Sequence, residues 1–324
     1  MTTYIGIDVS KDSLSVAVPK PNAGWKVDEY TNSPDGIRTL IGQLPDQAHC
    51  VLEATGSYSV LATYMLTHSG VTISVINPKQ SHHFAKMHLS ITKTDPRDAV
   101  LLAEYGRAIQ PPVYQMSNDS LLLLRQKRTL LRQYQKQRVA LLNLFASLQP
   151  LPLKDPTVQQ SLQQMIAHFE AAIAQLKAEV NQVCQADFTE QYKRLRSIKG
   201  ISYAVATALI ETTNGFRDFA SAKALAKFIG VAPVIYQSGK VGITKGINRS
   251  GDAHLRGQLY MASLSAIRYN KPCRECYQRL KAAGKVTNVA LMAVVNKLLR
   301  QAYAVVKFNE DYDPNYQPVL RSMA

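Results

Sequence analysis

Acidic residues, cysteines and long apolar runs are all scarce in this chain of 324 residues. The chain carries 23 aspartates and glutamates against 38 lysines and arginines, which gives a formal net charge of +15 at pH 7. This excess is typical of a protein that meets a polyanion, and it favours nucleic acid over an anionic membrane. We recognise neither an apolar run of membrane-spanning length nor a signal peptide, so we expect a cytoplasmic protein without a membrane partner.

The four cysteines indicate a reducing compartment. Cys273 and Cys276 would supply only two of the four ligands of a zinc site, and no second pair completes it. A hydrophobic content of 46% and a charged content of 19% describe a globular chain and exclude an intrinsically disordered one. The length allows two or three domains, each with a core of its own.

The N-terminal third of the chain alternates between strand and helix patterns. Five segments have the short apolar pattern of strands: residues 4–8, 13–18, 25–30, 50–53 and 71–76. A helix over residues 58–68 separates the last two strands, which implies that they pair in parallel. Three antiparallel strands followed by alternating strands and helices predict an α/β domain of the ribonuclease H-like class.

Acidic residues stand at three places from which they could converge. Asp8 and Glu53 each end an apolar strand, and open α/β sheets place their sites at the carboxyl ends of strands. Asp95 and Asp98 lie at the start of a helix that contains Pro96 in its first turn, and their spacing turns both carboxylates the same way. By themselves these two are explained as helix caps. Together the four acids would form an all-oxygen pocket for Mg²⁺, and two such ions about 4 Å apart can clamp a phosphodiester.

Residues 113–190 have the pattern of a helical arm. Apolar residues recur at heptad-like spacing in two long segments, which Pro150 and Pro152 separate. We therefore expect an antiparallel coiled-coil arm that is suited to contact between subunits. No acid lies between Asp119 and Asp155, whereas six basic residues accumulate between residues 125 and 138: Arg125, Lys127, Arg128, Arg132, Lys136 and Arg138. Such a run is either a solvated face or a nucleic-acid surface, and the lack of acids favours the latter.

The remainder is mostly helical and contains two glycine-bearing segments. Residues 199–202 (Lys-Gly-Ile-Ser) resemble the turn of a helix–hairpin–helix, whose backbone N–H groups face a phosphate; a plain turn between packed helices is the alternative. Residues 236–249 predict a loop that is rich in Gly and Lys and free of acids. Ser238 lies in this loop without a neighbouring His or carboxylate in the sequence to activate it. Helices are expected over residues 255–267, 274–283 and 288–306.

Three short motifs carry the four acids: residues 6–11 (Gly-Ile-Asp-Val-Ser-Lys), 52–56 (Leu-Glu-Ala-Thr-Gly) and 93–99 (Lys-Thr-Asp-Pro-Arg-Asp-Ala). In order and spacing, these motifs resemble the DEDD transposases of bacterial insertion sequences. Those are recombinases that are guided by a bridge RNA and carry a RuvC-like nuclease domain. The resemblance covers nearly the whole chain and implies that Asp8, Glu53, Asp95 and Asp98 hold the catalytic Mg²⁺.

In the C-terminal part, the same resemblance implies a serine nucleophile. The family carries this serine in a Ser-Gly motif of a second, C-terminal domain, and Ser238 is the residue that matches. Residues 250–256 resemble the Gly-Asn-x-x-Leu-Arg helix start of the family. Asp252 stands here in place of the usual Asn, while Arg256 is retained.

The resemblance also implies an organisation and a set of partners. A RuvC-like nuclease domain would span residues 1–112, a helical coiled-coil arm residues 113–190, and a C-terminal transposase domain residues 191–324. The enzyme would exchange strands between donor and target DNA through a covalent phosphoserine, under the guidance of a structured bridge RNA, as a homodimer or tetramer. The candidates for nucleic-acid contact are basic residues: Lys11, Lys93, Arg97, Arg125, Arg128, Arg132, Lys240, Lys245, Arg249 and Arg256.

Three alternatives stay open at this point. A metal-dependent DNA junction endonuclease would use the four acids to activate water, with Ser238 merely structural. Residues 6–10 also resemble the first phosphate loop of sugar kinases of the actin-like fold, but the second Asp-x-Gly loop and the Gly-rich adenosine site of such kinases are missing. A non-catalytic nucleic-acid binder gives no reason for four acids to converge. The acids and the basic charge together favour the recombinase.

Overall fold

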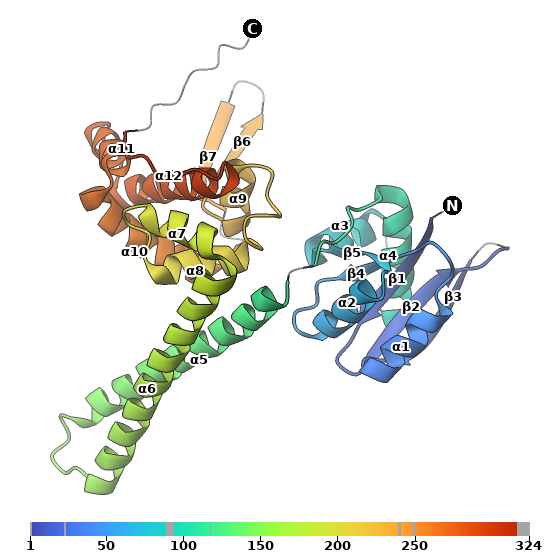
Figure 1. Cartoon of the computed structure of the whole chain (residues 1–324), viewed down its shortest axis with the longest axis horizontal. Helices are drawn as coiled ribbons and strands as arrows, with labels where there is room; N and C mark the ends of the chain where they lie inside the picture. The colour runs from blue at the N-terminus through green and yellow to red at the C-terminus, as the bar shows by residue number, and fades with distance from the viewer. Residues whose placement is uncertain are drawn as a thin grey trace. The chain divides into compact units, whose positions relative to one another are not determined.

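The computed structural model describes residues 2–22, 24–88, 94–116, 118–238, 241–248 and 251–315, with the backbone alone at residues 235–238 and 241–245. The chain divides into two compact units, Met1–Met116 and Ser117–Ala324 (Figure 1). Each unit has a hydrophobic core of its own. We therefore describe the two units one after the other.

The N-terminal unit is built on a five-stranded sheet of mixed pairing. Its strands are β1 (Thr3–Val9), β2 (Ser13–Pro19), β3 (Trp25–Thr31), β4 (Ala48–Glu53) and β5 (Thr72–Ile76). The spatial order is β3-β2-β1-β4-β5, with β1, β2 and β3 antiparallel and β1, β4 and β5 parallel. The α/β class predicted from the sequence is confirmed, and the sheet is compatible with a ribonuclease H-like transposase.

Helices cover both faces of this sheet (Figure 1). They are α1 (Pro34–Gln43), α2 (Tyr58–His68), α3 (Pro78–Met87) and α4 (Asp95–Ile109). Ile5 and Ile7 point into the core that α1 and α2 cover, whereas Val51 packs with side chains of α3 and α4 on the opposite face. Because side chains alternate along a strand, the second face also receives Gly6 and Asp8 of β1.

Gly6 lies where α4 crosses β1 most closely. A Cβ atom on Gly6 would stand 1.8 Å from the carbonyl oxygen of Ala99 and 2.5 Å from the backbone nitrogen of Ala103. Both atoms belong to the backbone, so no side-chain rotation can relieve the clash. The glycine of the first acidic motif is therefore required by the close approach of helix and strand, and this approach brings the first turn of α4 to the carboxyl end of β1.

We expect Gly6→Ala to destabilise the N-terminal unit by more than the 1–3 kcal/mol that is usual for overpacking, because the helix backbone itself must move. Urea denaturation measures the change. Gly42→Ala is the matched control, since Gly42 lies in α1 and a Cβ atom there meets nothing within 4 Å. The control should be neutral or stabilising by up to about 1 kcal/mol. Equal denaturation midpoints for the two variants would contradict the close approach.

The C-terminal unit is mostly helical and contains one strand pair. Its elements are α5 (Asp119–Leu148), α6 (Pro156–Asp187), α7 (Thr189–Ser197), α8 (Tyr203–Thr212), α9 (Ala222–Ile229), β6 (Pro233–Ser238), β7 (Val241–Ile247), α10 (Ala253–Tyr269), α11 (Lys271–Ala282) and α12 (Thr287–Lys307). Helices α5 and α6 pair along their length and project from the globular part of this unit (Figure 1). The coiled-coil geometry of this arm stays a prediction.

The base of the arm belongs to the core of the C-terminal unit. Leu121 and Leu124 of α5 and Val180 and Cys184 of α6 are buried in one cluster with residues of α7 to α12. Within the described part of the chain, one helix, α12, is long and apolar enough to cross a membrane by length and composition. The apolar stripe of α12 is largely buried in this same core, which explains its composition by packing.

The segment around Ser238 differs from the expected loop. Strands β6 and β7 pair antiparallel, and Ser238 ends β6 and pairs with Val241. The apolar residues Val234, Ile235 and Tyr236, with Val241 and Ile243 further along, are the strand signal that the glycines and lysines obscured.

Candidate functional site

Asp8 and Glu53 lie side by side at the edge of the sheet where the parallel strands end. Ile7 pairs with Leu52 in the parallel ladder between β1 and β4, so the next residues in register are Asp8 and Glu53. Gly6 and Val51 face α3 and α4, and Asp8 and Glu53 each come two residues later on the same strand, so they point to the same face. The two strand-end carboxylates are therefore on the sheet face that these helices cover.

The first turn of α4 carries the other two acids. Asp98 precedes Ala99, whose carbonyl oxygen faces Gly6 of β1, so this turn lies against the strand that carries Asp8 near its carboxyl end. The N-cap of α4 is Thr94, and the backbone N–H groups of Arg97 and Asp98 donate to its carbonyl oxygen at 2.9 Å. Asp95 is thus inside the first turn and is not the cap. Its negative charge there interacts favourably with the positive end of the helix dipole.

A serine that the sequence analysis did not single out contacts Glu53. Ser81 is 6% exposed on α3, and its hydroxyl donates to Oε2 of Glu53 at 2.5 Å, with the carbonyl oxygen of Pro78 at 2.9 Å. The short distance to Glu53 is typical of a charge-assisted hydrogen bond. The signal that could have found Ser81 is the Asn77-Pro78 helix start directly after β5, because β5 is the parallel neighbour of β4.

The turn after Asp8 is held by Asn32. Its Nδ2 atom donates to the carbonyl oxygens of Ser10 at 2.9 Å and Tyr58 at 3.1 Å. One side chain therefore ties the turn between β1 and β2 to the start of α2. Lys11 is exposed in this turn and Arg97 is exposed on the first turn of α4. Both cations remain candidates for nucleic-acid contact, while Lys93 lies outside the described residues.

The donor set of the four acids fits Mg²⁺ by its chemistry, because carboxylate oxygens are the ligands that this ion prefers. The placement of Asp8 beside Glu53, with the first turn of α4 against β1, is also suited to a shared ion. Among the described residues, however, no group of three or more His, Cys, Asp or Glu side chains is disposed to hold a metal ion. The structure thus brings the strand ends together but does not close a complete coordination shell.

Arg128 of the arm is buried, which corrects the expectation that it lies on an exposed basic face, whereas the side chain of Arg125 is 48% exposed. Arg128 is 5% exposed, and its Nη1 donates to Oε2 of Glu211 on α8 at 2.6 Å. Arg125 donates to Oε1 of the same carboxylate at 3.2 Å. The count of basic residues in the sequence could not reveal this burial. Arg128 in particular is a structural residue at the base of the arm.

Asp252 pairs with a third arginine of the arm and also caps a helix. Its Oδ1 accepts the backbone N–H groups of His254 at 2.8 Å and Leu255 at 3.1 Å, which caps α10, and its Oδ2 accepts from Arg132 at 3.0 Å. Burial acts to raise the pKa of Asp252, but these N–H groups and the charge of Arg132 outweigh it, so the pKa lies below its usual value. An ionised carboxylate caps a helix as an Asn does and adds an ion pair.

Arg256 also has a structural role. Its Nη1 donates to the carbonyl oxygens of Ile229 at 3.1 Å and Gly251 at 2.7 Å, so this guanidinium joins the end of α9 to the segment before α10. Lys240 and Arg249 lie outside the described residues. For Ser238 and Lys245 the backbone is described, on β6 and β7 respectively. The acids and Ser238 belong to different compact units of the chain.

Comparison with known proteins assigns the chain to a class. Residues 5–148 match a family model described as a transposase and named for its DEDD acids and the insertion sequence IS110. Residues 192–278 match a second model, described as a transposase of the IS116/IS110/IS902 family. Both compact units thus match proteins that move DNA segments.

Relatives over the full length agree with these matches. Pilin gene-inverting proteins of Moraxella bovis and Moraxella lacunata are each 30% identical over 323 residues, which covers 96% of this chain and 98% of theirs. The transposase for insertion sequence element IS1111A of Coxiella burnetii is 23% identical over 346 residues, covering 95% of this chain and 90% of its own. The chain belongs to the IS110/IS116 family of transposases. Membership implies DNA cleavage and transfer in general terms, and DEDD transposases are generally metal-dependent.

Proposed function

We propose that this transposase is an RNA-guided DNA recombinase of an insertion sequence, which exchanges strands of donor and target DNA through a phosphoserine intermediate. The observation that carries the proposal is the placement of Asp8 and Glu53 in adjacent register, on the face that α4 covers. The names of the two Moraxella relatives, which describe inversion of a gene, support recombination as the outcome.

In this proposal Asp8, Glu53, Asp95 and Asp98 hold Mg²⁺. When bound, the ion neutralises charge on the scissile phosphate. The chain's own contribution is orientation: the Ser81 hydroxyl fixes one oxygen of Glu53, and the contact between Gly6 and Ala99 fixes the turn that carries Asp98.

Ser238 is the nucleophile of the proposed reaction. Its Oγ forms a bond to phosphorus while the bond from phosphorus to the leaving strand oxygen breaks. The hydroxyl proton passes to solvent water and the leaving oxygen takes a proton from water, so one phosphoester bond is exchanged for another and no external energy source is needed. Because the phosphodiester is replaced by a phosphoserine ester, its bond energy is kept for joining a new strand. The acids and the serine belong to different units, so the complete site requires that the two units meet, within one subunit or between subunits.

The remaining parts of the proposal concern organisation. We assign residues 1–112 to a RuvC-like nuclease domain, 113–190 to a coiled-coil arm and 191–324 to the transposase domain that carries Ser238. The enzyme works in the bacterial cytoplasm as a dimer or tetramer. A structured bridge RNA selects the DNA sites by base pairing, while the protein contacts helix shape and backbone. The net charge of +15 suits both nucleic acids.

A two-plasmid recombination assay tests this function. The purified protein, with any RNA that copurifies, is incubated with donor and target plasmids, and junctions are sequenced together with the RNA. We expect precise donor–target junctions that disappear after ribonuclease treatment and return when the sequenced RNA is supplied as a transcript. Junctions that persist without RNA would remove the guide from the proposal. Cleaved plasmids with free ends and no junctions would instead identify a metal-dependent junction endonuclease.

A further inference from the structure

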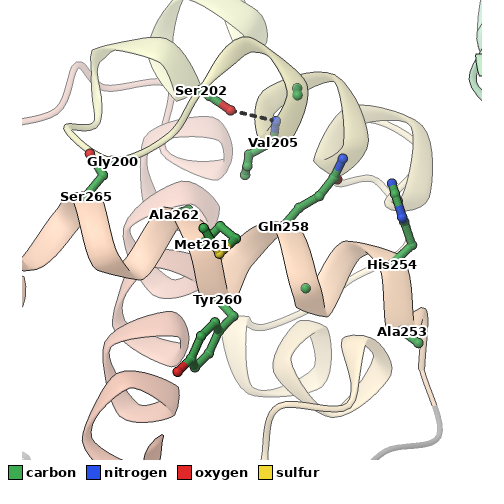
Figure 2. Close-up of a pocket in the computed structure, with 12 residues that line it drawn as sticks. Gly200, Ser202, Val205, Ala253, His254, Gln258, Tyr260, Met261, Ala262 and Ser265 are labelled. Carbon is green, nitrogen blue, oxygen red and sulfur yellow. Dashed lines mark hydrogen bonds between the residues drawn. The ribbon is translucent and has the colours of Figure 1, made fainter. Parts of the chain in front are cut away.

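A small cavity lies at the base of the arm, between α5, α6, α8 and α10. It has a volume of about 200 Å³ and is lined by Arg128, Arg132, Lys177, Tyr203, His254 and Gln258, among others. It adjoins a wider groove of about 900 Å³ between α8 and α10, and the two share Ala204, His254 and Gln258. In Figure 2, His254 and Gln258 extend from α10 toward α8, so they stand where cavity and groove meet.

Positive charge is in excess around the cavity. Arg128 and Arg132 line it together with Lys177, and no carboxylate is among the lining residues. Glu211 is shared by Arg128 and Arg125, and Asp252 binds Arg132. Three arginines thus meet two carboxylates, and Lys177 adds a fourth cation. Lys177 is half-buried on α6 and makes no ion pair with any described residue.

Two polar atoms at this place are buried without a partner among the described residues. They are Nε of Arg132, which is an N–H donor, and Oε1 of Gln258. Buried polar groups are rarely left without a partner, and each exception needs an explanation such as a missing ligand. The amide of Gln258 can also rotate to present its NH₂ group. Nε of Arg132 is therefore a donor without an acceptor among the described residues, and the Gln258 amide adds a second donor when its NH₂ group takes the place of Oε1.

Small residues line the adjoining groove, so the backbone of a ligand strand can approach it closely. Gly200, Ala204, Ala253 and Gly257 line it with little or no side chain, and Met261 contributes an exposed apolar surface. Ser202, also on the groove, caps α8 by accepting the backbone N–H of Val205 at 3.4 Å (Figure 2). The backbone of Gly200 has φ +107°, and a Cβ there would stand 2.8 Å from that of Ala266, so only glycine keeps the turn this close to α10.

We propose that the cavity binds one phosphate group of a nucleic-acid strand, with the adjoining sugar and base in the groove between α8 and α10. Lys177, Nε of Arg132 and the Gln258 amide donate to the phosphate oxygens. The imidazole of His254 can donate as well without adding charge. Burial and then the charge of Arg132 hold the pKa of His254 below its ordinary value, so this ring is neutral at pH 7. The assignment rests on the proposed function, since it takes nucleic acid as the ligand.

Lys177→Gln is the first test. Binding of a fluorescent single-stranded 20-mer is measured by anisotropy over a salt series, in EDTA so that no cleavage occurs. Loss of one phosphate contact should flatten the slope of log K against log salt by about 0.7. Lys297→Gln is the matched control, because Lys297 is also half-buried on a helix and without an ion pair among the described residues. Equal slopes for the two variants would overturn the strand assignment. Arg128 is unsuitable as a probe, since its loss would leave Glu211 without its buried partner.

Gln258→Leu separates binding from folding. Removing a buried polar atom that has no partner should keep or raise the thermal midpoint of the free protein, while binding of the 20-mer falls. A fall in both would mean that Gln258 is structural, and unchanged binding would exclude it from the site. Inorganic phosphate, compared with chloride at equal ionic strength, distinguishes the ligand source. In one outcome, phosphate raises the thermal midpoint of the unmodified protein but not that of Lys177→Gln, while the salt slope for the 20-mer is the same for both proteins. That result would assign the cavity to a free anion and overturn its assignment to a nucleic-acid strand.

This test is independent of the recombination chemistry. It needs neither a divalent metal nor Ser238, so a protein that fails the two-plasmid assay can still show the slope difference. Conversely, normal recombination by Lys177→Gln with an unchanged salt slope would overturn the phosphate site and leave the proposed function standing.

Discussion

Asp8→Asn, Glu53→Gln, Asp95→Asn and Asp98→Asn are each expected to abolish DNA strand cleavage while leaving both units folded. Each change keeps the size of the side chain and removes one negative charge from the proposed metal site. Removal of a single group that stabilises developing charge commonly costs a factor of about 10²–10³ in rate, and a lost metal ligand should cost at least as much. Cleavage of a labelled DNA in Mg²⁺ measures the effect, and binding of Mn²⁺ followed by its paramagnetic signal provides a readout apart from activity.

The melting temperatures of these variants without metal show whether the four carboxylates repel one another in the folded protein. Carboxylates that share a site repel one another, so removing one should hold or raise the melting temperature. Asp35→Asn is the control acid: Asp35 also lies in the first turn of a helix, but its side chain is 91% exposed and forms an ion pair with Arg38 on the surface. An Asp95→Asn variant that cleaves DNA normally and loses roughly 0.3–1 kcal/mol of stability, as expected when a charge is removed from a helix N-terminus, would show that Asp95 serves only the helix.

Ser238→Ala is expected to lose both the covalent intermediate and all cleavage, while still binding nucleic acid and Mg²⁺. The acid substitutions cannot distinguish the recombinase from an endonuclease, because both need the four acids. With a suicide DNA substrate, the unmodified protein should form an adduct that survives denaturant and that peptide mapping places on Ser238. Ser238→Cys should retain a trace of activity at most, since a thiol can attack phosphorus but its longer bonds shift the geometry.

Ser221→Ala is the control for this experiment. The Ser221 hydroxyl caps α9 by accepting the backbone N–H of Ala224 at 3.1 Å, so its loss should cost about 1 kcal/mol of stability and leave the adduct intact. Cleavage by Ser238→Ala at the rate of the unmodified protein would end the covalent mechanism. In that case the four acids would activate water, and the strand pair of β6 and β7 would have a structural or DNA-binding role.

The α/β architecture of the N-terminal unit and the strand-end positions of Asp8 and Glu53 followed from the sequence, whereas the convergence of all four acids stays a prediction. Short apolar runs of period two gave the strands, and the helix between the last two strands implied parallel pairing. Open α/β sheets place their sites at the carboxyl ends of strands, so the strand-end positions predict Asp8 and Glu53 at one edge, while the parallel pairing of β1 with β4 was decided by the tertiary structure. These inferences depend on local pattern and chain order, and both are written in the sequence. The same holds for the long helices of the arm, whose start and turn are marked by caps and prolines.

Partners and burial were decided only by the tertiary structure. Arg128 meets Glu211, 83 residues further along the chain, and Arg132 meets Asp252, 120 residues further along. A run of arginines has the same composition whether it faces solvent or an acid from a distant helix, so its burial could not be read locally. Ser81 beside Glu53, and the close approach of Ala99 to Gly6, likewise arise where separate elements pack. Local periodicity determined which elements form, whereas packing between elements determined which charges are neutralised inside the protein and which are left for a ligand.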